Sequence, residues 1–177
     1  MVTFVVLLRA IGPVTHRIMS MAQWREAVAA AGFINPQTYV ATGNMIVEGS
    51  GTPGQVTEQM DAVVRGLGLG EGNKAVVRTS RQLQMLVKSA PFPDAIAQRA
   101  GTVGVHFFAK ARPSFDWVAH YQGPERIHIA GQHLIVDYDD RSTSSRLPAI
   151  IERESGTATA RNWNTVKALA ERAAARG

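Results

Sequence analysis

The sequence predicts an α+β protein of two ferredoxin-like halves, each with the element order β-α-β-β-α-β, followed by a C-terminal helix. Two observations support this. Short apolar runs typical of buried strands alternate with segments in which apolar residues recur at helical spacing. The order of these segments over about residues 1–79 then recurs over about residues 103–160. No low-complexity linker separates the halves, so we expect one compact domain over residues 1–177.

The first half opens with a strand and a capped helix. Phe4 to Leu8 is a continuous apolar run of strand length. Ser20 and Gln23 have the spacing of a capping box, which predicts a helix from there to Gly32. The other expected elements of this half are a hairpin of residues 38–41 and 45–47 around Thr42-Gly43-Asn44, a helix capped at Thr52 and ended by Gly66, and a strand over residues 74–79.

The second half repeats this order after a connecting helix over residues 80–100, in which a helical segment over residues 80–89 is followed by a proline-marked link at Pro91-Phe92-Pro93. Its expected elements are a strand over residues 103–109, a short helix over 114–120, a hairpin of 125–130 and 133–138, a helix over 144–154 and a strand over 157–160. An amphipathic helix over residues 161–175 ends the chain, with Trp163, Val166 and Leu169 on its apolar face. Trp163 is therefore expected in the core, with a stacking platform for a ligand as the alternative.

Composition narrows the class of protein. No apolar run approaches the roughly 20 residues of a membrane-spanning helix, and the apolar start has no basic leader, so we expect a soluble cytoplasmic protein without a membrane partner. The absence of cysteine excludes disulfides, thiol catalysis and thiolate metal sites. The net charge of +5 and the pI near 10.1 allow a polyanionic partner, but the arginines are spread along the chain instead of clustered.

Four segments resemble DUF1697, a bacterial family of unknown function: Leu7-Leu8-Arg9, Tyr39 to Asn44, Ser145-Arg146-Leu147, and Thr159 to Thr165, which is similar to a T-x-R-N-W-N-T motif. The resemblance implies a pair of ferredoxin-like halves and no established activity. The sequence departs from the family pattern directly after Arg9, where a glycine- and asparagine-rich loop is replaced by a segment containing Pro13, which lacks a backbone N–H donor.

Two arginines suggest an anion site. Arg146 and Arg161 are expected at or near helix N-termini, where the helix dipole disfavours a cation unless an anion is bound. Ser145 and Thr159 add hydroxyl donors beside them. The alternative is that each arginine pairs with a nearby acid: Glu152, Glu154 or Asp137.

Arg9, Asn44, Asn162 and Asn164 complete the predicted ligand pocket. The strand end at Arg9, the hairpin turn at Asn44 and the helix starts are expected to meet at one edge of the fold. Each asparagine also has a structural interpretation: Asn44 as a turn residue, and Asn162 and Asn164 as helix caps.

Metal and histidine chemistry have little support in the sequence. Asp137 and Asp139 could share a hard cation from one strand face, but a solvated loop at the strand end is the better explanation, and no metal or cofactor is predicted. His106, His128 and His133 have no identifiable acid or nucleophile partner, and no phosphate-loop, dinucleotide or nucleophile-elbow motif occurs.

The leading functional hypothesis is therefore a protein that binds a small anionic or nucleotide-like ligand. A nucleic-acid-binding module that uses the basic surface is the second hypothesis, and a self-associating scaffold without a ligand is the third. Enzymatic activity stays undecided, with Arg161 as the residue that would stabilise a developing anion.

Overall fold

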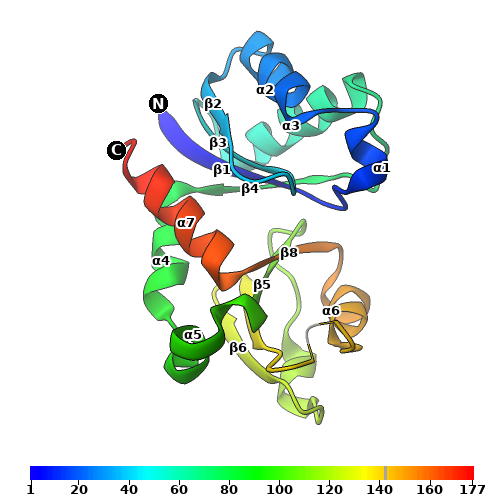
Figure 1. The fold of residues 1–177 in the computed structure, drawn as a ribbon, viewed down its shortest axis with the longest axis vertical. Helices are drawn as coiled ribbons and strands as arrows, with labels where there is room; N and C mark the ends of the chain where they lie inside the picture. The colour runs from blue at the N-terminus through cyan, green and yellow to red at the C-terminus, as the bar shows by residue number, and fades with distance from the viewer. Residues whose placement is uncertain (142) are drawn as a thin grey trace. The chain divides into compact units, whose positions relative to one another are not determined.

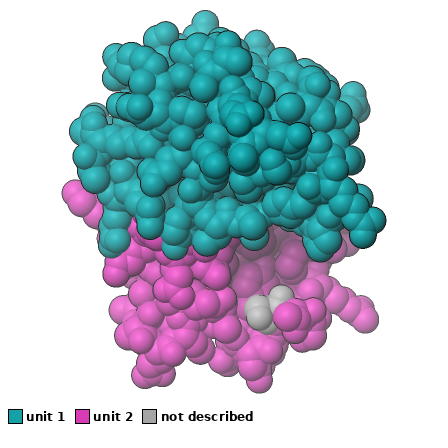
Figure 2. All heavy atoms as spheres, turned by 45° about the horizontal axis from the view of Figure 1, so that its top comes forward, with its two compact units in different colours: residues 1–84, 169–177 teal, residues 85–168 magenta. Residues whose placement is uncertain are grey.

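The computed structural model describes residues 1–141 and 143–177, and the chain divides into two compact units. The first unit comprises residues 1–84 and 169–177, and the second comprises residues 85–168 (Figure 2). Each unit holds one four-stranded antiparallel sheet with helices, which is an α+β architecture. That the units form a single domain stays a prediction.

The first unit has the ferredoxin-like strand order β2-β3-β1-β4. Its strands are β1 (Val2–Leu8), β2 (Ile34–Thr38), β3 (Asn44–Gly49) and β4 (Ala75–Thr79), and α1 (Pro13–His16) follows β1. The helices α2 (Met21–Ala30) and α3 (Pro53–Gly66) lie on one face of the sheet (Figure 1). Alternate residues of β1, namely Phe4, Val6 and Leu8, are completely buried in the core that these helices close.

Both predicted capping boxes are confirmed. The Ser20 hydroxyl accepts the Gln23 backbone N–H at 3.1 Å, and the Gln23 side chain accepts the Ser20 N–H at 2.8 Å. Thr52 and Gln55 make the same pair at 3.2 and 2.9 Å. These bonds satisfy N–H groups that the first turn of each helix leaves unpaired, which fixes where α2 and α3 begin.

The first hairpin is wider than predicted. Strand β2 ends at Thr38 and β3 begins at Asn44, so residues 39–41 belong to a five-residue loop and not to a strand. Val40 in this loop has a φ of 49°, which breaks the extended conformation that its β-propensity favours. The Asn44 side chain is buried and donates to the Tyr39 carbonyl at 3.1 Å and to the Thr42 hydroxyl at 2.9 Å, which closes the loop.

The second unit repeats the strand order as β6-β7-β5-β8. Its strands are β5 (Val103–Phe108), β6 (Arg126–Ala130), β7 (His133–Asp137) and β8 (Ala158–Asn162). A short 3-10 helix, η2 (Asp116–His120), takes the place of the first helix, and α6 (Leu147–Ser155) takes the place of the second (Figure 1). The element order predicted for this half is thus present, with a shorter first helix.

The connecting helix predicted over residues 80–100 is divided at its proline-marked link, Pro91-Phe92-Pro93. The segment forms two helices, α4 (Ser80–Ser89) and α5 (Pro93–Arg99), followed by the 3-10 turn η1 (Ala100–Thr102). Ala90 and Phe92 have φ values of 31° and 58°, and each precedes a proline that disfavours a helical conformation before it. These two positions end α4 and set the start of α5.

The C-terminal helix begins later than the predicted residue 161, so Arg161 lies near the helix start but in a strand. Strand β8 continues to Asn162, with Arg161 opposite Val105 and Asn162 opposite Gly104 of β5. The C-terminal helix α7 (Trp163–Ala174) begins only after this pairing ends. Trp163 is buried, as predicted for a core residue.

Candidate functional site

Two adjoining cavities lie beside β5 and β8 in the second unit, with volumes of about 210 and 220 Å³. Both are lined by His106, Pro148 and Ala160. The first is also lined by Gly101, Thr102, Gly104, Tyr138, Arg161 and Asn162, and the second by Ala149, Glu152, Ala158 and Thr159. We call the two together the β5–β8 groove.

A buried polar pair forms one wall of the groove. His106 of β5 and Tyr138, which directly follows β7, place Nε2 and Oη 2.8 Å apart, and the two residues are 4% and 5% exposed. The Tyr138 ring lies over Gly104, where an added Cβ would meet a ring carbon at 2.9 Å. A glycine at this strand position is therefore required for the pair to form.

Burial keeps both members of the pair neutral. Desolvation lowers the pKa of His106 from 6.5 to about 4, although the charge of Glu152 opposes the shift. Desolvation also raises the pKa of Tyr138 above its ordinary value. At neutral pH the wall therefore offers hydrogen-bonding groups without net charge.

Arg161 brings a positive charge to the groove. Its Nη1 donates to the Thr159 hydroxyl at 2.6 Å and to the Ala160 carbonyl at 2.8 Å, which holds the guanidinium against the edge strand β8. Burial lowers the pKa of Arg161 from 12.5 to about 10, so the group stays charged at neutral pH. Its position is set by strand pairing with Val105 of β5.

The two signature asparagines differ in role. The Asn162 Oδ1 accepts the backbone N–H of Thr165 at 2.9 Å, which caps the first turn of α7, while the residue also lines the groove. Asn164 is exposed in the first turn of α7 and is not part of the groove lining. The cap interpretation therefore holds for Asn162.

Ser145 and Arg146 lie beside the start of α6, outside the groove lining. The Ser145 hydroxyl donates to Glu125 and accepts the Leu147 backbone N–H at 3.1 Å. Glu125 is buried and also accepts the Tyr121 hydroxyl at 2.6 Å; desolvation opposes ionisation, but these bonds lower its pKa. Ser145 therefore has a structural partner, and Arg146 is exposed.

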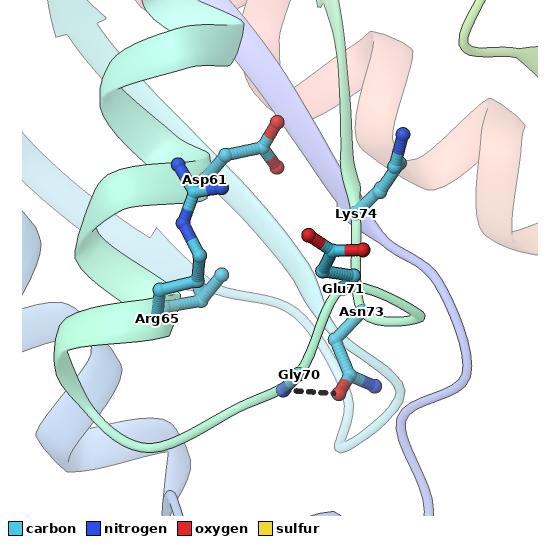
Figure 3. A pocket seen from close by; sticks show the side chains of 7 residues that line it. Asp61, Arg65, Gly70, Glu71, Asn73 and Lys74 are labelled. Atoms are coloured by element: carbon cyan, nitrogen blue, oxygen red, sulfur yellow. Dashed lines mark hydrogen bonds between the residues drawn. The ribbon is translucent and has the colours of Figure 1, made fainter.

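Arg9 and Asn44 belong to the first unit, whereas the other predicted residues belong to the second. The Arg9 carbonyl accepts the Asn73 side-chain amide at 3.1 Å. Asn73 also lines a cavity of about 150 Å³ at the end of α3, shown in Figure 3, together with Asp61, Arg65, Glu71 and Lys74.

Of the eight predicted ligand residues, three line the β5–β8 groove: Thr159, Arg161 and Asn162.

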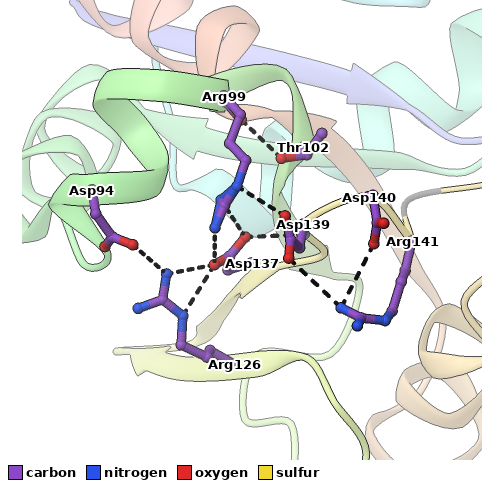
Figure 4. Close-up of polar contacts among 8 residues, drawn as sticks. All are labelled: Asp94, Arg99, Thr102, Arg126, Asp137, Asp139, Asp140 and Arg141. Carbon is purple, nitrogen blue, oxygen red and sulfur yellow. Dashed lines mark hydrogen bonds and ion pairs between the residues drawn. The ribbon is translucent and has the colours of Figure 1, made fainter.

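The aspartates at the end of β7 form ion pairs with arginine side chains of the same unit (Figure 4). The almost completely buried Asp137 carboxylate accepts both terminal nitrogens of Arg99 at 3.2 and 3.0 Å, and Nε of Arg126 at 3.0 Å. Arg126 also pairs with Asp94, and Arg99 with Asp139. Across residues 1–141 and 143–177, no group of three or more His, Asp or Glu side chains has the geometry of a metal site.

Sequence reasoning missed the His106–Tyr138 pair, which is the central polar feature of the groove. The two residues are 32 positions apart and meet only through the pairing of β5 with β7. Two local signals were available: a histidine within an apolar strand, and a glycine two residues before it. Neither signal identifies the partner.

Comparison with known proteins shows the fold and the family. The conserved bacterial protein SP0830 from Streptococcus pneumoniae has a similar structure, with a TM-score of 0.73 over 97% of this chain and 98% of that one, at 12% sequence identity. No curated protein matches the chain. Within the described residues, no helix combines the length and apolar character needed to cross a bilayer.

A family model described as a protein of unknown function matches residues 1–134. The matched range contains Leu7-Leu8-Arg9 and the hairpin segment Tyr39 to Asn44, and it ends before Ser145 and before the Thr159 to Thr165 motif. The match covers well over half of the sequence, and so the chain belongs to the DUF1697 family.

Proposed function

We propose that the β5–β8 groove binds a small ligand with an anionic group, such as a carboxylate or a phosphate, and that Arg161 pairs with this group. One juxtaposition supports the proposal above all. Arg161 lines the same cavity as the neutral His106–Tyr138 pair, so a fixed cation and a hydrogen-bonding wall border one space. Ligand sites commonly combine a mainly apolar hollow with a few polar groups in this way.

The setting of Arg161 favours anion binding for two physical reasons. Its guanidinium is held by Thr159 and by the Ala160 carbonyl, so little side-chain freedom is lost when a ligand binds. It is also half-buried, and a charge-assisted hydrogen bond is stronger where water is partly excluded. Asn162 lines the same cavity, and its side-chain amide can add a neutral donor.

Binding, without proton transfer, is the chemistry that this geometry supports at neutral pH. A general acid or base works best when its pKa lies near the working pH. Burial moves the pKa of His106 well below that range and the pKa of Tyr138 well above it. The pair is suited to hold a ligand by hydrogen bonds and not to exchange protons with it.

Calorimetric titration with ribose 5-phosphate tests the proposal. We expect saturable binding that persists at high ionic strength, because the site is partly enclosed. Arg161→Met should weaken binding roughly tenfold to a hundredfold, the range for losing a hydrogen bond to a charged group, and Arg161→Lys should retain part of it. Arg65→Met changes an arginine of the first-unit cavity and serves as the matched control, with no expected effect.

Two results would count against the proposal. One is equal affinity of the wild-type protein and Arg161→Met, with both shown to be folded by circular dichroism. The other is the absence of saturable binding by ribose 5-phosphate, inorganic phosphate and acetate. Salt-sensitive binding of a short single-stranded RNA in that second case would favour the nucleic-acid hypothesis instead.

A further inference from the structure

Strand β8 is an edge of its sheet and has an unbroken register. Within the described residues it pairs with β5 alone, in the order β6-β7-β5-β8, and its register with β5 shows no shift. Strand β2, an edge strand of the first unit, contains Pro36 and a register shift between Ile34 and Gln37. Arg176 also donates to the Asn35 carbonyl of β2 at 2.7 Å. Prolines and irregular pairing protect an edge strand from pairing with another chain, and β8 has neither.

The backbone of Ala158, Ala160 and Asn162 forms the outward edge of β8. Opposite residues of an antiparallel pair alternate between positions that exchange hydrogen bonds and positions that do not. The Ala109 N–H donates to the Thr157 carbonyl at 3.0 Å, so every second residue counted from Thr157 bonds to β5. The residues between these, namely Ala158, Ala160 and Asn162, direct their N–H and C=O groups away from β5.

Two side-chain hydrogen bonds agree with this alternation. Glu152 Oε1 accepts the Ala158 N–H at 3.1 Å, and Arg161 Nη1 donates to the Ala160 carbonyl at 2.8 Å. The N–H groups of Ala160 and Asn162 also point outward, and neither has an acceptor within residues 1–141 and 143–177. Both residues are exposed, so this part of the strand edge is open to solvent.

The β5–β8 groove adjoins this edge and has room for side chains. Ala158, Ala160 and Asn162 share one face of β8 with His106, because His106 lies opposite Ala160. The two cavities, of about 210 and 220 Å³, are bordered by this face and by Pro148 of α6. Pairing of β8 with the β8 strand of a second copy would bring only two alanines and an asparagine to the cavities. A strand with larger side chains at alternate positions fills them better.

We infer that an extended segment of a partner protein binds beside β8 as an additional antiparallel strand. Its carbonyls accept the N–H groups of Ala160 and Asn162, and one of its N–H groups donates to the Ala160 carbonyl, whose oxygen has two lone pairs. Its apolar side chains at alternate positions enter the groove. In strand addition of this kind the backbone bonds give affinity and the pockets give sequence preference. The inference uses the backbone of β8 and does not depend on the proposed function.

Selection of a phage-displayed library of random heptapeptides on the wild-type protein supplies the probe. The dissociation constant of an enriched peptide is then measured by fluorescence anisotropy, with each peptide amide N-methylated in turn. We expect methylation at alternate residues to weaken binding roughly tenfold or more and methylation between them to have little effect, because only alternate amides of an added strand face β8.

Variants of the edge strands locate the binding site. Ala160→Pro removes an N–H that does not bond to β5, so the sheet should persist and peptide binding should weaken roughly tenfold or more. Ala160→Ser keeps this N–H and a small side chain, and it should bind as the wild type does. Ile129→Pro changes an exposed residue of β6, the other edge strand of the sheet, and serves as the matched control with no expected effect.

Several results would overturn the inference. They are a selection that enriches no binding peptide, a methylation scan without alternation, and peptide affinity that is equal in the wild type and Ala160→Pro. Dimerisation of the wild type that Ala160→Pro abolishes, without peptide binding, would assign the edge to a second copy instead. If Ala160→Pro does not fold, as judged by circular dichroism, the methylation scan on the wild type still decides.

Discussion

The two units have sheets of equivalent strand order, but the helices that cover these sheets differ in length. His106 occupies the sheet position that Val6 holds in the first unit, since Val6 pairs with Val77 of β4 and His106 with Ala160 of β8. In the first unit two regular helices, of 10 and 14 residues, seal this face, and Val6 is completely buried in an apolar core. In the second unit the corresponding helices have 5 and 9 residues, and a groove borders His106.

This difference shows how one topology can separate stability from recognition. A sealed apolar face stabilises the fold because its side chains are buried, but it exposes no group that a ligand could contact. A shortened helix layer leaves part of the sheet uncovered, and polar residues at central strand positions then border a hollow. The second unit still has an apolar core, around Phe108, Leu134 and Ile151, so its groove is added beside a core and does not replace it.

Emptying the sealed core should have the largest effect. Trp24 is completely buried among the first-unit core residues, so Trp24→Ala should lower the free energy of unfolding by about 3–5 kcal/mol, measured by urea denaturation. Its indole N–H has no partner among the described residues, so Trp24→Phe should cost much less. A loss below about 1 kcal/mol for Trp24→Ala would contradict the sealed-core description.

Lowering the pH should reduce the stability of the second unit, because His106 is buried in its neutral form. Its folded pKa of about 4 lies below the ordinary value of 6.5, so the unfolded state takes up the proton first. The stability is therefore fully present above pH 6.5 and falls as the pH drops toward 4, by roughly 3 kcal/mol at 1.36 kcal/mol per pKa unit.

Carboxylates such as Glu125, whose pKa is lowered in the folded protein, also reduce the stability in acid. The test therefore compares the wild type with a variant that lacks His106. The free energy of unfolding should fall less between neutral pH and pH 4 in the His106→Val, Tyr138→Phe double variant than in the wild type. Parallel curves for the two proteins would show that His106 is not the group responsible.

Exchanging the equivalent strand positions sharpens the comparison. Val6→His puts a ring with no partner into the sealed core and should cost roughly 1–3 kcal/mol, the range for burying an unpaired polar group. His106→Val with Tyr138→Phe removes both partners of a buried bond together and should be nearly neutral. Denaturant unfolding measures both, and equal costs for the two changes would mean that the two faces are equivalent.

Local signals account for the part of the fold that could be predicted. The capping boxes at Ser20 and Thr52 specify helix starts within four residues of sequence, and the apolar alternation of the central strands identifies the sheet face. In the connecting segment the two prolines mark the break after residue 89, but the second helix, α5, was not predicted, and the positive φ values at Ala90 and Phe92 have no strong signature in residues other than glycine.

The candidate site was predicted less completely because it depends on pairing between distant strands. Arg161 and Asn162 have neither helical nor strand periodicity of their own, and their pairing with β5 determines that they are strand residues. Arg161, which its chemistry singles out in the sequence, lines the groove, and its role in binding a ligand stays a prediction. Asn44 and Ser145 carry the same polar chemistry but bond within the fold, which a sequence pattern alone does not distinguish.

Mapping of amide chemical shifts during titration with ribose 5-phosphate tests the central claim most directly, namely that the second unit holds the binding site. Shifts should concentrate on the groove residues Gly104, Ala160 and Asn162, and the amides of Gly70 and Asn73 at the first-unit cavity should stay unchanged. Shifts confined to Gly70 and Asn73, or spread evenly over exposed basic residues of both units, would contradict the claim.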